Sequence, residues 1–87
     1  MTDPNRIRQA ILDAIETRGP GKTTCPSEIA RQLAGSDEKV WRLMMAPIRS
    51  VAVELALSGE ARILRKGRAV DPRDFKGIYR LALPSEG

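Results

Sequence analysis

Apolar residues at helical spacing predict a first helix near the start of the chain. The residues on its apolar face are Ile7, Ala10, Ile11, Ala14 and Ile15. Asp3 suits the N-cap, and Pro4 suits the first helical position, where a missing N–H costs nothing. Residues 19–21, Gly-Pro-Gly, end the helix. We expect the glycine-rich segment that follows to be a plain connection between two helices.

A second helix is predicted from about Pro26 to Ala34, and Gly35 fits its left-handed cap. Its inward face comprises Ile29, Ala30 and Leu33. Cys25 would be its N-cap, with Glu28 reaching back to the Cys25 N–H. A thiol at a helix N-terminus can have a lowered pKa, which makes Cys25 the one candidate nucleophile.

A third helical stretch begins after Ser36, which can act as its cap. Its apolar face contains Val40, Trp41, Met44 and Met45. Pro47 leaves two alternatives, because proline kinks or breaks a helix: one bent helix over residues 37–58, or a short helix and a new one starting at Pro47. We favour the second alternative. Either way, residues 46–58 form a helix with a buried stripe at Ile48, Val51, Ala52 and Leu55.

Beyond Gly59 the pattern changes to that of a β-hairpin. In the return strand, residues 78–83, the side chains of Tyr79, Leu81 and Leu83 alternate with those of Arg80 and Ala82, the period of a half-buried strand. Residues 61–66 form a less regular partner. The connection, residues 67–77, is long for a hairpin and contains an Asp71-Pro72 bend. Helices followed by a hairpin predict an α+β, mainly helical fold: a winged helix-turn-helix of three to four helices and a C-terminal β-hairpin wing.

The 87 residues suffice for one domain, residues 1–87, with a thin core. The net charge of +4 is unevenly distributed. Residues 61–80 carry seven basic and two acidic side chains, a net +5, whereas the rest of the chain carries eight basic and nine acidic ones, a net −1. A localised basic patch favours a polyanionic partner, although a solvated face that keeps a small protein soluble would look the same.

These features predict a nucleic-acid-binding module, with double-stranded DNA as the partner. Helix 46–58 would be the recognition helix, with Arg49 and Ser50 facing the major groove. Loop 67–77 would be a basic wing, and the phosphate-contacting side chains at this end of the hairpin would be Arg65, Lys66, Arg68, Arg73 and Lys76.

The same helix also supports an alternative. Val53 and Leu57 lie beside the proposed reading face and resemble a partner-binding surface more than a base-reading one. The alternative function is therefore a protein-interaction or regulatory module that uses the winged-helix scaffold for self-association or for a protein partner, without DNA.

Enzymatic, cofactor-dependent and membrane functions are not expected. The chain has no histidine to activate Cys25, and we see no metal-ligand cluster or triad, so we predict neither catalysis nor a bound metal or cofactor. No apolar run approaches the length of a membrane span. A single cysteine and the absence of a signal-peptide core favour a cytoplasmic location.

The motifs also resemble a known family. They are Gly-Pro-Gly-Lys-Thr at 19–23, Cys-Pro-Ser-Glu at 25–28, Trp-Arg-Leu-Met at 41–44, Ile-Arg at 48–49, Lys-Gly-Arg at 66–68, Val-Asp-Pro at 70–72, Gly77 and Arg-Leu at 80–81. Together they resemble a family of short bacterial proteins, domain of unknown function 3253, over residues 7–83. The resemblance implies a winged-helix-like fold and implies no activity.

Overall fold

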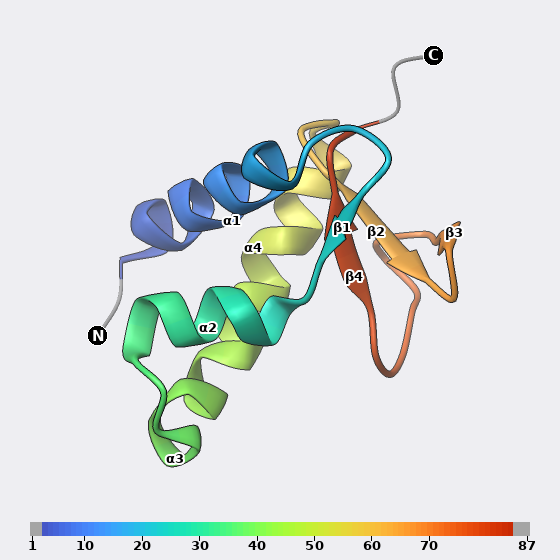
Figure 1. Ribbon diagram of the computed structural model, residues 1–87. Helices are drawn as coiled ribbons and strands as arrows, with labels where there is room; N and C mark the ends of the chain where they lie inside the picture. The colour runs from blue at the N-terminus through green and yellow to red at the C-terminus, as the bar shows by residue number, and fades with distance from the viewer. Residues whose placement is uncertain (1–2, 85–87) are drawn as a thin grey trace.

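The computed structural model describes residues 3–84 of the chain. Within this range the elements occur in the order α1 (Pro4–Arg18), β1 (Thr23–Thr24), α2 (Pro26–Ala34), α3 (Glu38–Trp41), η1 (Arg42–Met44), α4 (Met45–Leu57), β2 (Arg62–Arg65), β3 (Arg68–Ala69) and β4 (Arg80–Ala82). The helices pack together on one side, and the sheet extends from them on the other (Figure 1). This α+β, mainly helical arrangement is the one the sequence predicts, and it is consistent with a winged helix-turn-helix.

The ends of the first two helices follow the sequence closely. The Asp3 carboxylate accepts a hydrogen bond from the Asn5 N–H at 2.9 Å, which makes Asp3 the N-cap of α1. Cys25 occupies the N-cap position of α2, but its side chain makes no capping hydrogen bond. The expected contact from Glu28 back to the Cys25 N–H is not made. The Glu28 carboxylate instead accepts from the Thr24 hydroxyl at 3.3 Å.

The segment around Pro47 contains two helices joined by a short 3-10 turn, as the favoured alternative had it. The second helix, α4, starts at Met45, two residues before the predicted start, so Pro47 is its third residue. Proline is tolerated there because the N–H groups of a first helical turn have no partner within the helix. The cap of the preceding α3 is Asp37, whose carboxylate accepts from the Lys39 N–H at 3.0 Å, rather than Ser36.

The sheet is antiparallel, in the order β1-β4-β2-β3. Ile63 in β2 pairs with Leu81 in β4, and Thr24 in β1 pairs with the same Leu81 from the other side. The predicted hairpin is therefore confirmed in β2 and β4, although both strands are shorter than the predicted ranges of 61–66 and 78–83.

Two strands correct the sequence analysis. The glycine-rich connection contains β1, which pairs with β4, so it is not a plain linker between helices. The predicted loop 67–77 contains β3, which folds back on β2 through Leu64↔Ala69 and Arg65↔Arg68 pairs. Each of these strands is two residues long, too short for an alternating pattern to reveal.

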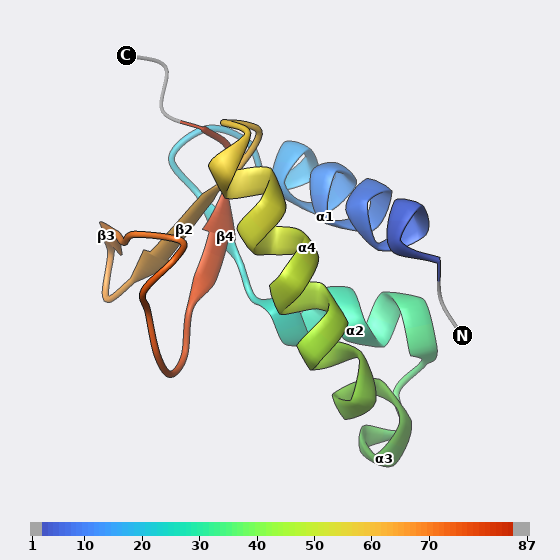
Figure 2. The ribbon, with the colours of Figure 1, turned by 180° about the vertical axis from the view of Figure 1, so that it is seen from behind.

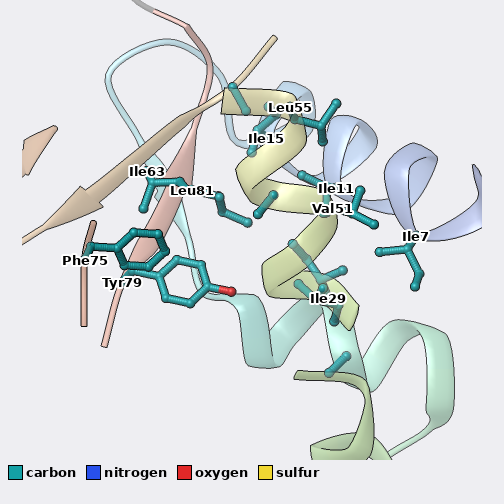
Figure 3. Close-up of a cluster of buried hydrophobic side chains, with 14 residues drawn as sticks. Ile7, Ile11, Ile15, Ile29, Val51, Leu55, Ile63, Phe75, Tyr79 and Leu81 are labelled. Atoms are coloured by element: carbon teal, nitrogen blue, oxygen red, sulfur yellow. The ribbon is translucent and has the colours of Figure 1, made fainter. Parts of the chain in front are cut away.

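The core lies between the three longer helices and one face of the sheet (Figure 3). The isoleucines of α1 point toward α4, and side chains from β2 and β4 close the other side. The largest fully buried apolar side chains are Ile7, Ile11, Ile15, Ile29, Ile48, Leu55, Ile63 and Leu81. Burying each of them stabilises the fold by roughly 1.5–3 kcal/mol, which is why α1, α2 and α4 hold their positions.

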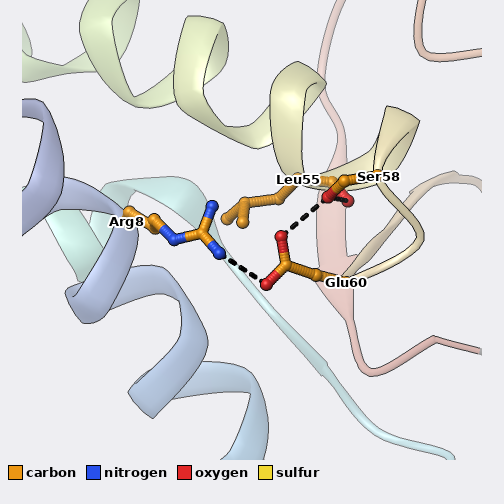
Figure 4. A network of polar contacts seen from close by, with 4 residues as sticks. All are labelled: Arg8, Leu55, Ser58 and Glu60. Atoms are coloured by element: carbon orange, nitrogen blue, oxygen red, sulfur yellow. Dashed lines mark hydrogen bonds and ion pairs between the residues drawn. The ribbon is translucent and has the colours of Figure 1, made fainter.

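A polar network fixes α1 to the turn after α4 (Figure 4). The Arg8 guanidinium forms an ion pair with Glu60 at 2.5 Å, and the Ser58 hydroxyl donates to the same carboxylate at 2.7 Å. The hydroxyl of Ser58 and the guanidinium of Arg8 together lower the pKa of Glu60 below its usual value. With the Glu60 carboxyl in its charged form, the network therefore holds the start of β2 against the helices.

Candidate nucleic-acid interface

The distal end of β2 turns tightly into β3. Lys66 and Gly67 both have positive φ, 53° and 80°, as a type I′ hairpin turn requires. Glycine adopts this backbone freely, whereas lysine adopts it at a cost. The turn therefore holds the exposed Lys66 side chain at the outer end of the sheet, with Arg65 and Arg68 paired just behind it.

Residues 70–79 cross from β3 back to β4 and are anchored on α4. The Arg49 guanidinium donates a 2.6 Å hydrogen bond to the Phe75 carbonyl, and its central carbon lies 3.9 Å from the centre of the Phe75 ring. Phe75 and Tyr79 are both buried, and their rings meet edge to face with centres 5.3 Å apart. Arg49 therefore fixes the wing to the first half of the proposed recognition helix.

A second arginine fastens the end of this crossing segment. Arg65 Nε donates to the Ile78 carbonyl at 3.0 Å. The same guanidinium lies so close to Gly77 that a Cβ there would stand 3.0 Å from Arg65 Nη2. A glycine at 77 thus lets Arg65 approach the backbone before β4. This contact joins the β2–β3 hairpin to the end of the crossing segment.

The predicted phosphate-contacting residues gather at this end. Four of them are exposed: Lys66, Arg68, Arg73 and Lys76. Arg65 is half-buried because it binds Ile78. Two acids share the crossing segment, and one of them, Asp71, accepts the Arg73 N–H at 2.9 Å and shapes the bend there. Of the five predicted wing side chains, the structure therefore exposes four and holds the fifth, Arg65, against the crossing segment.

The two residues predicted on the recognition helix have different surroundings. Ser50 is exposed. Arg49 is half-buried and engaged with Phe75, so its contacts provide a structural role, and its base-reading role stays a prediction. The exposed positions along α4 are Ala46, Ser50, Glu54 and Leu57. This face carries no basic side chain and one carboxylate, which gives α4 little attraction for a polyanion.

The Val53 and Leu57 surface is only partly open. Leu57 is 49% exposed, but Val53 packs against the core. The larger apolar surface is elsewhere, in a groove of about 920 Å³ between the start of α1, the end of α2, α3 and α4. Leu43 beside it is 70% exposed and Val40 is 45% exposed. Val40 belongs to the predicted apolar face of this helical stretch but stays exposed, whereas Trp41, Met44 and Met45 of the same face pack against the core.

Tyr79 is the one buried side chain with an unsatisfied polar atom within residues 3–84. Its hydroxyl has no hydrogen-bond partner there and points toward the start of α2 (Figure 3). Burial raises the pKa of Tyr79 to about 12, although the nearby Arg49 charge acts in the opposite direction. The side chain is thus kept neutral under physiological conditions, and it fills space beside Phe75.

Three features of this region were not in the sequence prediction: the burial of Phe75, the 86% exposure of Ile78 and the groove. Phe75 sits in a charged segment, Asp-Phe-Lys, whose composition indicates a loop. Ile78 is apolar, but it directly precedes Tyr79 and shares the outward phase of Arg80, so the alternation of the return strand agrees with its exposure.

Comparison with known proteins places the chain in a family. A search of curated proteins finds no match. No helix within residues 3–84 is long and apolar enough to cross a membrane. Residues 4–84 match the family described as Protein of unknown function (DUF3253), which covers nearly the whole chain and confirms the resemblance seen in the motifs. The chain therefore belongs to the DUF3253 family.

Proposed function

We propose that this protein binds double-stranded nucleic acid, with the wing as its main contact. The observation that supports this proposal is the set of exposed cations at one end of the sheet: Lys66, Arg68, Arg73 and Lys76. Phosphates need positive charge at suitable spacing and little sequence precision, and exposed lysine and arginine side chains on two adjacent loops provide this.

The anchor at Arg49 supports a common surface for the wing and α4. A wing that moved freely would lose entropy on binding, whereas a wing held to α4 by a 2.6 Å hydrogen bond keeps its cations in place. In this proposal α4 is the recognition helix, and Ser50 is its exposed polar contact in the major groove of the DNA. Because Glu54 shares that face, the wing provides most of the affinity and sequence preference is weak.

The test is fluorescence anisotropy of a labelled random-sequence duplex at about 50 and 200 mM salt. Binding should fall by orders of magnitude between these salt concentrations, because each neutralised phosphate releases counterions. Lys66→Asn and Arg68→Ala should each reduce the slope of log affinity against log salt by about one. Asparagine accepts a positive φ, so the Lys66 variant removes the charge and keeps the turn.

Arg6→Ala is the matched control. Arg6 is an exposed arginine in the first turn of α1. The start of α1 lies on the far side of the molecule from β3 (Figures 1 and 2). Its replacement removes the same charge and should leave the salt slope unchanged. An absence of duplex binding at about 50 mM salt would refute the proposed function, and equal slopes for all three variants would refute the wing contact.

The groove favours a second candidate function, a module that pairs with another copy of itself. A twofold interface requires one surface to be complementary to itself, and this face carries both an exposed apolar side chain, Leu43, and an apolar hollow. Opposite charges lie beside them, with the exposed Arg42 next to Leu43 and Glu54 lining the groove. A second copy can therefore place each arginine near the other copy's glutamate.

Sedimentation at several protein concentrations tests this candidate. Leu43→Ser should convert a dimer to a monomer, whereas Leu57→Ser, at the other exposed leucine, should leave the dimer intact. If Leu57→Ser dissociates the dimer and Leu43→Ser does not, the interface lies at the end of α4. A wild-type protein that stays monomeric at all concentrations refutes self-association.

A further inference from the structure

The most exposed large apolar side chain within residues 3–84 is Ile78, at 86%. It belongs neither to the core nor to the groove. It directly precedes the buried Tyr79, at the point where the crossing segment of the wing enters β4. A single exposed apolar side chain is ordinary on a flat surface, but this one stands at the tip of a charged wing.

The surroundings of Ile78 are basic and fixed. Its carbonyl accepts the hydrogen bond from Arg65 Nε, and Arg65 pairs across the hairpin with Arg68. Lys76 precedes it by two residues and is exposed. The backbone of this exposed isoleucine is therefore held by one arginine, and further cations lie in β3 and two residues before it in the crossing segment.

We propose that Ile78 is an apolar wedge that enters the minor groove of the bound duplex and rests against a base step. This inference rests on the proposed function and assigns the part of the duplex that the wing contacts. The minor groove is about 6 Å wide, which admits an inserted side chain more readily than a helix. Proteins that use such a wedge pair it with lysine and arginine on the adjacent phosphates.

Nucleic acid fits this tip better than a lipid surface does. Membrane-binding segments bury a broad apolar face, whereas this tip offers a single isoleucine. A wedge between base steps needs only one apolar side chain, because the phosphate contacts supply the remaining affinity.

Two duplexes that differ only in the minor groove provide the test. Replacing guanine by inosine removes the N2 amino group from the minor groove and leaves the major-groove edge unchanged, so the inosine duplex admits a wedge more easily. The wild type should bind the inosine duplex several-fold more tightly than the guanine duplex. Ile78→Ser should remove this preference and weaken binding to the inosine duplex about tenfold.

The salt slope separates the wedge from the phosphate contacts. Ile78→Ser removes no charge and should keep the wild-type slope, whereas Lys66→Asn should lower the slope and keep the preference for inosine. Ile78 is so exposed that its replacement should leave the thermal unfolding curve unchanged. A variant that melts with the wild type therefore reports on binding alone.

The remaining outcomes overturn either the wedge alone or both the wedge and the proposed duplex binding. Salt-sensitive binding without an inosine preference, or a preference that survives in Ile78→Ser, overturns the wedge and leaves the proposed function standing. An absence of binding to either duplex overturns both. Binding to vesicles of anionic lipid in place of DNA, abolished in Ile78→Ser, also overturns both and assigns the tip to a membrane surface.

Discussion

Arg49 offers the sharpest test of how the wing is held. Replacing it with methionine keeps an unbranched chain that can cover Phe75 but removes the guanidinium. A hydrogen bond from a charged donor contributes about 1.5–3 kcal/mol, and a guanidinium over an aromatic ring about 0.5–1 kcal/mol at a partly exposed site. Because Arg49 is half-buried, we expect Arg49→Met to lower the free energy of opening the wing by about 2 kcal/mol.

Hydrogen exchange followed residue by residue measures this change. The Asp74 N–H donates to the Asp71 carbonyl at 3.0 Å within the crossing segment, so its exchange rate reports opening of the wing. A loss of about 2 kcal/mol corresponds to exchange roughly 30 times faster. The Ile11 amide, in the middle of α1, is the internal control and should keep nearly its wild-type rate.

A double-mutant cycle with Phe75→Leu separates the two parts of the contact. The leucine variant keeps the backbone carbonyl that Arg49 binds and loses only the ring, so the coupling energy should be about 0.5–1 kcal/mol. Arg49→Lys should recover only part of the stability, since an ammonium lacks the planar face that stacks on the ring. Unchanged exchange at Asp74 in Arg49→Met would refute the anchor.

Further predictions concern the core, the polar network and the turn. Tyr79→Phe should leave the free energy of unfolding unchanged or raise it by about 1 kcal/mol in urea titrations, because it removes a buried unpaired hydroxyl. The folded-state pKa of Tyr79 is raised from 10.0 to about 12, so its contribution to stability is complete below pH 10 and is lost as pH rises toward 12, a slope that Tyr79→Phe should lack. The lowered pKa of Glu60 gives the opposite sign: thermal unfolding should show stability lost as pH falls through the acidic range, and Glu60→Gln should reduce that loss. Gly67→Ala should cost about 1–2 kcal/mol in chemical unfolding because φ is 80° there, and an unchanged midpoint would contradict the assigned turn.

The sequence predicts α1 and α2 well because each combines a strong apolar stripe with local end signals. Asp3 and Pro4 mark one start, and Gly19 and Gly35 mark the two ends, through contacts within a few residues. Such signals can be recognised from the residues at each helix end alone. The start of α4 was less accurate because Pro47 is compatible with any position in a first turn.

The misses share a different cause, which is pairing between distant residues. Thr23 is a strand residue because Ala82 lies opposite it, and nothing near Thr23 in sequence requires this. The Lys66–Gly67 turn lacks the usual Asn-Gly signal of a tight hairpin, so the sequence did not predict β3. The contact of Arg49 with Phe75 was missed because the two residues are 26 positions apart, and Arg49 was predicted only as a groove-facing side chain. The excess of basic residues in the wing is a property of the sequence itself and needs no pairing to detect.

The position of β4 constrains the order of folding. This strand lies between β1 and β2, yet it is the last of the four along the chain. On the ribosome, the pairing of β4 with β1 and with β2 can form only after residue 82 has been synthesised. The helices α1, α2 and α4 can pack before then. The helical half can therefore collapse early. Closing the sheet becomes the slow step, because Thr23 and Ala82 have the largest sequence separation of the strand pairs within residues 3–84.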